Sequence, residues 1–99
     1  MRFRYFIWVS LLISSCTNEN SNKNSGKLIF EKNCVTCHGL KGNLQVSGAS
    51  DLTASQLSKE QMIEVIKDGR NTMSPYKGTL SASEINAVAK HVIDLRAKK

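Results

Sequence analysis

Two cysteines and a histidine stand together in the segment Cys34-Val35-Thr36-Cys37-His38. The two thiols are three positions apart, and an imidazole follows the second thiol directly. A thiol can form a covalent bond to a ligand, and an imidazole nitrogen can ligate a metal ion. One short stretch of chain therefore offers two attachment points and one metal ligand.

This spacing is that of the attachment motif for c-type haem. Two vinyl groups on adjacent edges of a porphyrin react with two thiols three positions apart, and the histidine that follows is held beneath the iron. The pattern predicts thioether bonds from Cys34 and Cys37 and iron ligation by His38. The chain holds one such motif, which predicts one covalent haem c.

Three other uses of the same residues are weighed against haem attachment. A dithiol redox site of the thioredoxin type requires a surrounding βαβ pattern, which the sequence lacks. Structural zinc requires four ligands, and the only other histidine is His91, inside a helical segment. A disulfide between Cys34 and Cys37 is chemically open to an exported chain.

Residues 1–15 have the features of an export signal. Arg2 and Arg4 precede the apolar run 5–13, and two serines follow it. The run covers nine residues, whereas a helix that spans a membrane needs roughly 20. The segment is therefore a targeting signal rather than a spanning helix.

Cys16 follows this signal in Ile13-Ser14-Ser15-Cys16, which resembles a bacterial lipobox. It is the third of three cysteines and has no part in the haem motif, so lipidation gives it a use. We expect a lipid anchor at Cys16, a flexible polar tether through residue 25, and a single domain over residues 26–99. The alternative is an ordinary signal peptide and a soluble periplasmic protein.

The domain contains three amphipathic helical segments and no convincing strand. The first runs over about 27–34, with Ser25 as its N-cap. The second ends before Gly69, and the third continues through Leu95. The last two segments begin with capping-box spacing, in the pairs Ser58 with Gln61 and Ser81 with Glu84. The long loops 39–57 and 69–80 separate the three segments and are expected to wrap a ligand.

Together these features resemble the class I cytochromes c over about residues 26–95. The matching parts are residues 26–30, Cys34 to Gly39, Asp51-Leu52-Thr53, the helix leading to Gly69, Met73-Ser74-Pro75 and the closing helix from Ser81. The resemblance implies an all-α fold, the small cytochrome c fold, in which three main helices and long loops surround one haem. It also implies a methionine as the sixth iron ligand.

Met73 and Met62 are the two candidates for that ligand. Met73 lies in the loop 69–80 at the family's ligand position, although Ser74 separates it from Pro75. Met62 lies on the apolar face of a helix, where it is expected to fill the core. The resemblance also implies that Leu52 packs on the haem. The carbonyl of Ser50 stands where the family commonly has a proline that accepts a hydrogen bond from the proximal imidazole.

The resemblance further implies a close crossing of the first and last helices at Gly26 and Phe30. His91 takes the place of the aromatic residue that usually completes this crossing, and it is expected to pack there rather than to ligate iron. Arg70 and Tyr76 flank Met73, either as partners of a haem propionate or as surface groups.

These features predict a single-electron carrier at the periplasmic side of a bacterial membrane rather than an enzyme. Its expected partners are a redox protein donor, a redox protein acceptor and, through the anchor, the membrane; the chain is expected to act as a monomer. Loss of residues 1–15 leaves 12 Lys and Arg against 8 Asp and Glu, spread along the chain, which excludes a nucleic-acid footprint. The alternatives are a haem c subunit or accessory domain of a larger oxidase or reductase, and a haem-based ligand sensor.

Overall fold

A computed structural model of the chain describes residues 19–98, with side chains from residue 25 onward. Four α-helices and one turn of 3₁₀ helix make up its regular structure. They are α1 (Glu19–Asn33), α2 (Val35–His38), η1 (Val46–Gly48), α3 (Lys59–Asp68) and α4 (Ala82–Ala97). Apart from an isolated bridge between Arg70 and Met73, the described residues contain no β-structure. The predicted all-α fold is confirmed.

The two capping boxes form as predicted. The Gln61 amide donates to Ser58 Oγ at 3.1 Å, and the Ser58 amide donates to Gln61 Oε1 at 2.9 Å. Ser81 and Glu84 make the same pair of bonds at 3.1 and 3.0 Å. These bonds satisfy amide groups that the first turn leaves without partners, which fixes the starts of α3 and α4.

The first helix differs from its prediction. It begins at Glu19 rather than near residue 27, so the segment predicted as a tether is helical from residue 19, and Ser25 lies inside α1 instead of capping it. Once residues 26–33 pack on α4, each further helical residue adds a hydrogen bond without a new nucleation cost. This propagation explains a helix over residues that have no apolar pattern.

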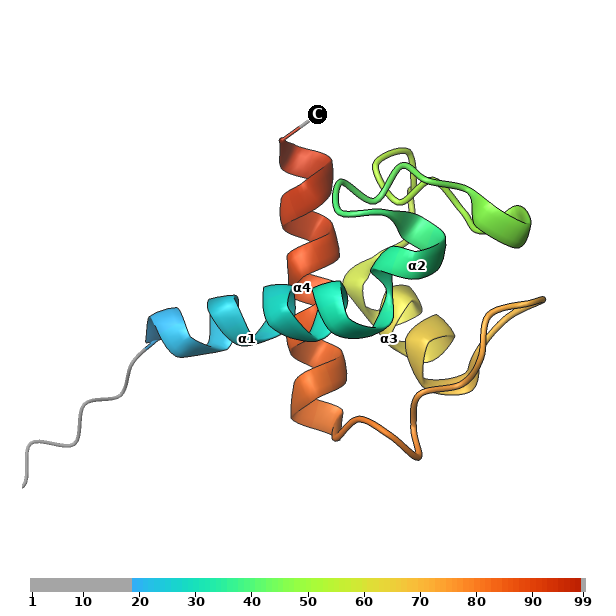
Figure 1. Cartoon of the computed structure of the whole chain (residues 1–99). Helices are drawn as coiled ribbons and strands as arrows, with labels where there is room; N and C mark the ends of the chain where they lie inside the picture. Colours follow the sequence, from blue (N-terminus) through green and yellow to red (C-terminus); the bar gives the residue numbers. More distant parts are fainter. Residues whose placement is uncertain (1–18, 99) are drawn as a thin grey trace, which may run out of the picture.

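The core forms where α1 lies across the middle of α4 (Figure 1). A side chain at Gly26 would overlap the carbonyl oxygen of Ala87, so glycine allows the close approach. Phe30 is 1% exposed and contacts the His91 ring, with centroids 5.0 Å apart. The predicted crossing at Gly26 and Phe30, with His91 in the aromatic position, is therefore confirmed.

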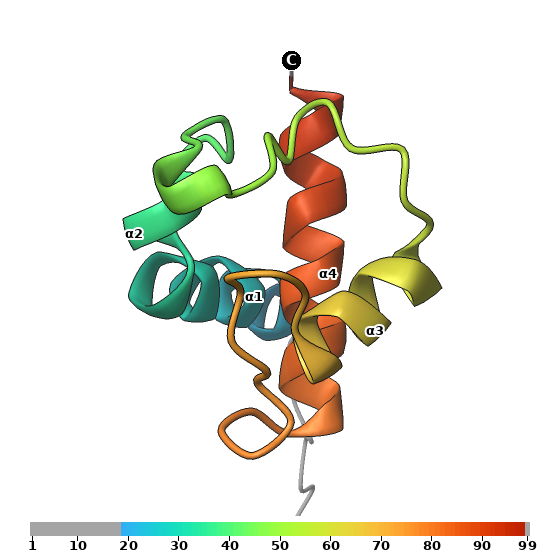
Figure 2. The ribbon, with the colours of Figure 1, turned by 90° about the vertical axis from the view of Figure 1, so that its right-hand side faces the viewer.

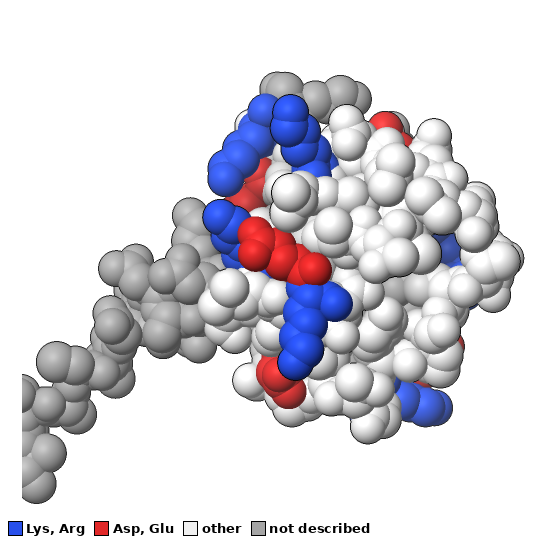
Figure 3. Space-filling model, in the orientation of Figure 1, with Lys and Arg blue, Asp and Glu red and all other residues white. Residues whose placement is uncertain are grey.

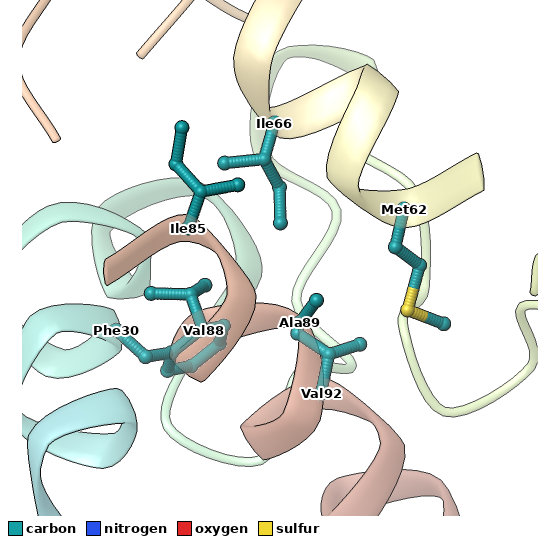
Figure 4. Packing of buried hydrophobic residues seen from close by; sticks show 7 residues of the cluster. All are labelled: Phe30, Met62, Ile66, Ile85, Val88, Ala89 and Val92. Carbon is teal, nitrogen blue, oxygen red and sulfur yellow. The ribbon is translucent and has the colours of Figure 1, made fainter. Parts of the chain in front are cut away.

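α3 packs on the other side of α4 and completes the core (Figure 4). The buried cluster joins residues from three helices: Phe30, Met62, Ile66, Ile85, Val88, Ala89 and Val92. The two predicted loops connect these helices, and they lie with α2 and α3 on one side of α4, which is to the right in Figure 1 and faces the viewer in Figure 2. Arg96 fixes the first loop to α4, because its Nη1 donates to the carbonyls of Ser55 and Leu57 at 2.8 and 3.0 Å.

Candidate functional site

A cavity of about 420 Å³ lies between the two loops, α2, α3 and α4. This volume is within the usual range for ligand sites in proteins, about 300–1,000 Å³. All five residues predicted to contact the haem line it: Cys34, Cys37, His38, Leu52 and Met73. The structure thus brings together residues that stand in three separate parts of the sequence.

The attachment motif forms one helical turn at the end of α1. The amides of Cys37 and His38 both donate to the Cys34 carbonyl, at 3.3 and 3.0 Å. The turn stops at Gly39, whose φ of 76° lies in the region that favours glycine. Because residues three apart share one side of a helix, this turn places both thiols on the wall of the cavity.

His38 is held in one orientation by a backbone carbonyl. Its Nδ1 lies 3.0 Å from the Ser50 carbonyl oxygen, and the residue is only 9% exposed. With Nδ1–H as donor, Nε2 is the nitrogen left for a metal ion. The hydrogen bond from Nδ1 to Ser50 also raises the basicity of the imidazole as a ligand. Ser50 therefore makes the contact that the sequence places at a position commonly held by proline.

Short hydrogen bonds support the loop that carries Ser50. The Leu52 amide donates to the Gly42 carbonyl at 2.7 Å, and the Leu44 amide donates to the His38 carbonyl at 2.9 Å. Thr53 donates to Asp51 Oδ1 through its amide and its hydroxyl, at 3.0 and 2.6 Å. These bonds constrain the loop without a proline ring.

Met73 reaches the cavity from the second loop and is half-buried. Arg70 and Met73 exchange two backbone hydrogen bonds, of 3.2 and 2.9 Å, which close a tight turn directly after α3. Met62 also lines the cavity, but it is 5% exposed and belongs to the buried cluster. Its side chain extends from α3 beside Val92 of α4 (Figure 4).

The electrostatics of the thiols bear on the thioredoxin and zinc alternatives. Burial, followed by the neighbouring Cys37, raises the pKa of Cys34 to about 11, so this thiol stays protonated near neutral pH. A dithiol redox site requires a thiol whose pKa is lowered instead. Within residues 19–98, no group of three or more His, Cys, Asp or Glu side chains gathers, so zinc has no ligand set there.

The two residues that flank Met73 differ in their surroundings. The Tyr76 hydroxyl donates to the Asn33 carbonyl at 3.2 Å, so its proton is already engaged within the protein. Arg70 is exposed, and it is the one Lys, Arg, Asp or Glu side chain among the described residues that line the cavity. On the face seen in Figure 3 the charged side chains gather mainly over α1 and α4, and the part of this face towards the two loops is largely uncharged.

Several lining residues could not be identified from the sequence. Val46 and Ser47 of η1 and Ala49 directly after it form part of the wall, and Thr72 donates from its Oγ1 to the Ser47 carbonyl at 3.0 Å. No local pattern marks a contact between residues so far apart.

Cys16 and the export signal lie outside the described residues. No helix within residues 19–98 is both long and apolar enough to cross a membrane.

Taken together, the cavity fits a covalent haem. Two thiols line its wall, and an imidazole held through Nδ1 stands directly after them. A thioether donor reaches the same cavity from a second loop, and apolar side chains of the core form its inner wall. Thiol, imidazole and thioether are the protein groups that bind haem c.

Comparison with known proteins also relates this chain to proteins that bind haem c. The family described as cytochrome C oxidase, cbb3-type, subunit III matches residues 21–92. Cytochrome c6 of Leptolyngbya boryana is 31% identical over 80 residues, covering 75% of this chain and 93% of that protein. The cbb3-type cytochrome c oxidase subunit FixP of Bradyrhizobium sp. (strain ORS 278) is 36% identical over 90 residues, covering 84% of this chain and 31% of FixP.

A solved structure agrees with these relatives. The KustC0563 c-type cytochrome superposes with a TM-score of 0.62 at 30% identity, covering 75% of this chain and 96% of its own. Relatives of these kinds support electron transfer by haem c as the general function. The chain therefore belongs to the cytochrome c family, in the group described as cbb3-type oxidase subunit III, and its cofactor is covalently bound haem c.

Proposed function

We propose that the chain is a single-electron carrier, attached to haem through Cys34 and Cys37 and ligating its iron through His38 and Met73. The observation that carries this proposal is the cavity, which has the attachment turn on one wall and Met73 on a segment from the other loop. Haem c bound there supplies one-electron chemistry between ferrous and ferric iron.

Each side chain of the site has a separate task in this proposal. The Ser50 carbonyl orients His38 through Nδ1 and strengthens it as a ligand. Met73 is a soft, neutral donor that favours the ferrous state and raises the reduction potential. Leu52 and the buried residues of α1 and α4 exclude water, which disfavours the more highly charged ferric state in the same direction.

With His38 and Met73 both on the iron, the protein leaves no coordination position for a substrate. This is why we propose a carrier rather than an enzyme. A haem-based ligand sensor would need an exchangeable sixth position instead. Carbon monoxide separates the two functions, because it binds ferrous iron readily only where that position is open.

A second candidate is a haem c subunit or accessory domain of a larger oxidase. The match to the cbb3-type subunit III family and to FixP favours it, whereas cytochrome c6 and its high coverage favour a separate carrier. Purification under mild detergent distinguishes the candidates. A free carrier elutes as a monomer, and a subunit elutes with the other chains of its complex.

We further propose that Cys16 carries acyl chains that hold the protein at the periplasmic side of a bacterial membrane. The support is the sequence Ile13-Ser14-Ser15-Cys16 behind an export signal, together with a third cysteine outside the haem motif. Two acyl chains give stable membrane binding, whereas one chain binds only marginally. The anchor would keep the carrier close to a membrane-bound donor and acceptor.

Extraction of haem tests the central part of the proposal. Acid-acetone should leave all the haem on the wild-type protein, because thioether bonds survive conditions that remove axial ligands. Cys34→Ala and Cys37→Ala should each retain haem through one bond, and the double variant should lose it. Quantitative loss of haem from the wild-type protein would show that the thiols are not attached.

A further inference from the structure

The segment that carries Met73 is fixed at its first end by backbone contacts. Gly69, with a φ of 76°, ends α3, and a side chain there would stand 2.5 Å from the Met73 carbonyl oxygen. The two hydrogen bonds between Arg70 and Met73 then close the turn, with Asn71 at a φ of 55°. These contacts join Met73 to α3 but not to the opposite wall, which holds the attachment turn.

The second end of the segment is fixed by Tyr76. Its amide donates to the Ile66 carbonyl of α3 at 3.0 Å, and its hydroxyl donates to the Asn33 carbonyl at 3.2 Å. Asn33 is the last residue of α1 and directly precedes Cys34. The Tyr76 side chain therefore links the methionine segment to the helix end at which haem is attached.

The surroundings of Tyr76 strengthen this link. The residue is half-buried and lines the cavity, and this burial raises the pKa of its hydroxyl. A hydrogen bond sheltered from water is stronger than an exposed one. The bond from the Thr72 hydroxyl to the Ser47 carbonyl, which joins the second loop to the first, is exposed.

We propose that Tyr76 is a positioning residue for the sixth ligand: its hydrogen bond to the Asn33 carbonyl holds the Met73 segment against the helix end that bears Cys34. This inference rests on the proposed function, in which Met73 ligates the iron. Release of Met73 from iron would require the segment to move away, and the hydrogen bond opposes that movement.

Removal of the hydroxyl in Tyr76→Phe tests the link with little change in packing. The variant should then lack the one hydrogen bond, of ordinary net strength, that holds the Met73 segment against the helix end. Imidazole, which competes with Met73 for ferric iron, should bind about five- to tenfold more tightly. The sulfur-to-iron charge-transfer band should disappear at correspondingly lower imidazole concentrations, and the reduction potential without imidazole should fall slightly.

Two further variants make the result specific. Thr79→Val removes a hydroxyl from the same loop, and that hydroxyl makes no hydrogen bond among the described residues; its imidazole affinity should match the wild type. Met73→Ala should abolish the band altogether. Loss of the band in Met73→Ala with unchanged imidazole affinity in Tyr76→Phe would overturn this inference alone. An intact band in Met73→Ala would overturn the proposed ligation.

A measurement on the wild-type protein keeps the inference testable if Tyr76→Phe does not fold. Tyr76 is the only tyrosine in residues 16–99, so ultraviolet resonance Raman of the haem protein reports the hydrogen bonding of this one hydroxyl. Displacement of Met73 by imidazole should shift the tyrosine signal to that of a water-exposed hydroxyl. A signal that does not change during the titration would refute the link.

Discussion

Replacement of Gly26 by alanine should destabilise the protein, because α1 crosses α4 at this residue. The added methyl group would overlap the carbonyl oxygen of Ala87 and stand 2.8 Å from its carbonyl carbon. Both atoms belong to the backbone, so no side-chain rotation relieves the contact. The helices would have to separate by about 1 Å to restore an ordinary contact of about 3.5 Å.

The expected loss follows from two opposing effects. Overpacking in a core costs about 1–3 kcal/mol, and separation of the helices also loosens the packing of Phe30, which is 1% exposed. Alanine in place of glycine within a helix returns about 1 kcal/mol. We expect a net loss of about 1–2 kcal/mol, which lowers the midpoint of thermal unfolding by about 5–15 °C in a domain of this size.

Two other glycines provide matched controls in the same assay, far-ultraviolet circular dichroism of the ferric haem protein. No atom lies within 4 Å of a side chain at Gly78, so Gly78→Ala should change the midpoint little. Gly48 lines the haem cavity and has a φ of 80°, so Gly48→Ala should cost at least about 1 kcal/mol through its backbone. A midpoint for Gly26→Ala at or above the wild-type value would refute the close crossing.

Three further predictions concern the ligand, the helix crossing and the anchor. Met73→Ala should remove the sulfur-to-iron band and open the ferrous iron to carbon monoxide, whereas Met62→Leu should do neither; exchanged phenotypes would reverse the ligand assignment. Burial lowers the pKa of His91 below its ordinary 6.5, so just below pH 6.5 the unfolded chain binds more protons than the folded protein. The stability present above pH 6.5 should therefore be lost as the pH falls from 6.5 through the pKa of the folded protein. His91→Phe should flatten that part of the unfolding profile, and an unchanged slope would exclude His91 as the cause. Mass spectrometry should find an acylated Cys16 at the N-terminus, and Cys16→Ser should release the protein from membranes with its haem spectrum unchanged; a mature N-terminus without lipid would contradict the anchor.

Local signals in the sequence were sufficient to predict the framework of the fold. The capping boxes at Ser58 and Ser81 depend on residues three positions apart, so they are visible without any tertiary information. The close crossing was predictable for a different reason, since Gly26 and Phe30 match a known family. The start of α1 at Glu19 was not predictable, because that part of the helix follows from packing further along the chain.

Some features of the site could likewise be predicted from the sequence, and others could not. Cys34, Cys37 and His38 form one contiguous motif, and the loop that carries Met73 was recognisable by its position. The bonds from His38 to Ser50 and from Tyr76 to Asn33 join distant residues, of which one partner in each case is a backbone carbonyl. Every residue has such a carbonyl, so residue type does not reveal which one will accept a bond.

The crossing of α1 and α4 also constrains the order in which the molecule is assembled. α4 is synthesised after the other three helices, and until it is present Phe30 lacks its contact with the His91 ring and the cavity lacks the wall formed by Val88 and Val92. An open chain exposes both thiols, whereas the closed fold half-buries Cys34 and raises the pKa of its thiol to about 11, which weakens it as a nucleophile. We therefore expect haem to be attached before α4 docks, so that the cofactor becomes the surface on which α4 completes folding.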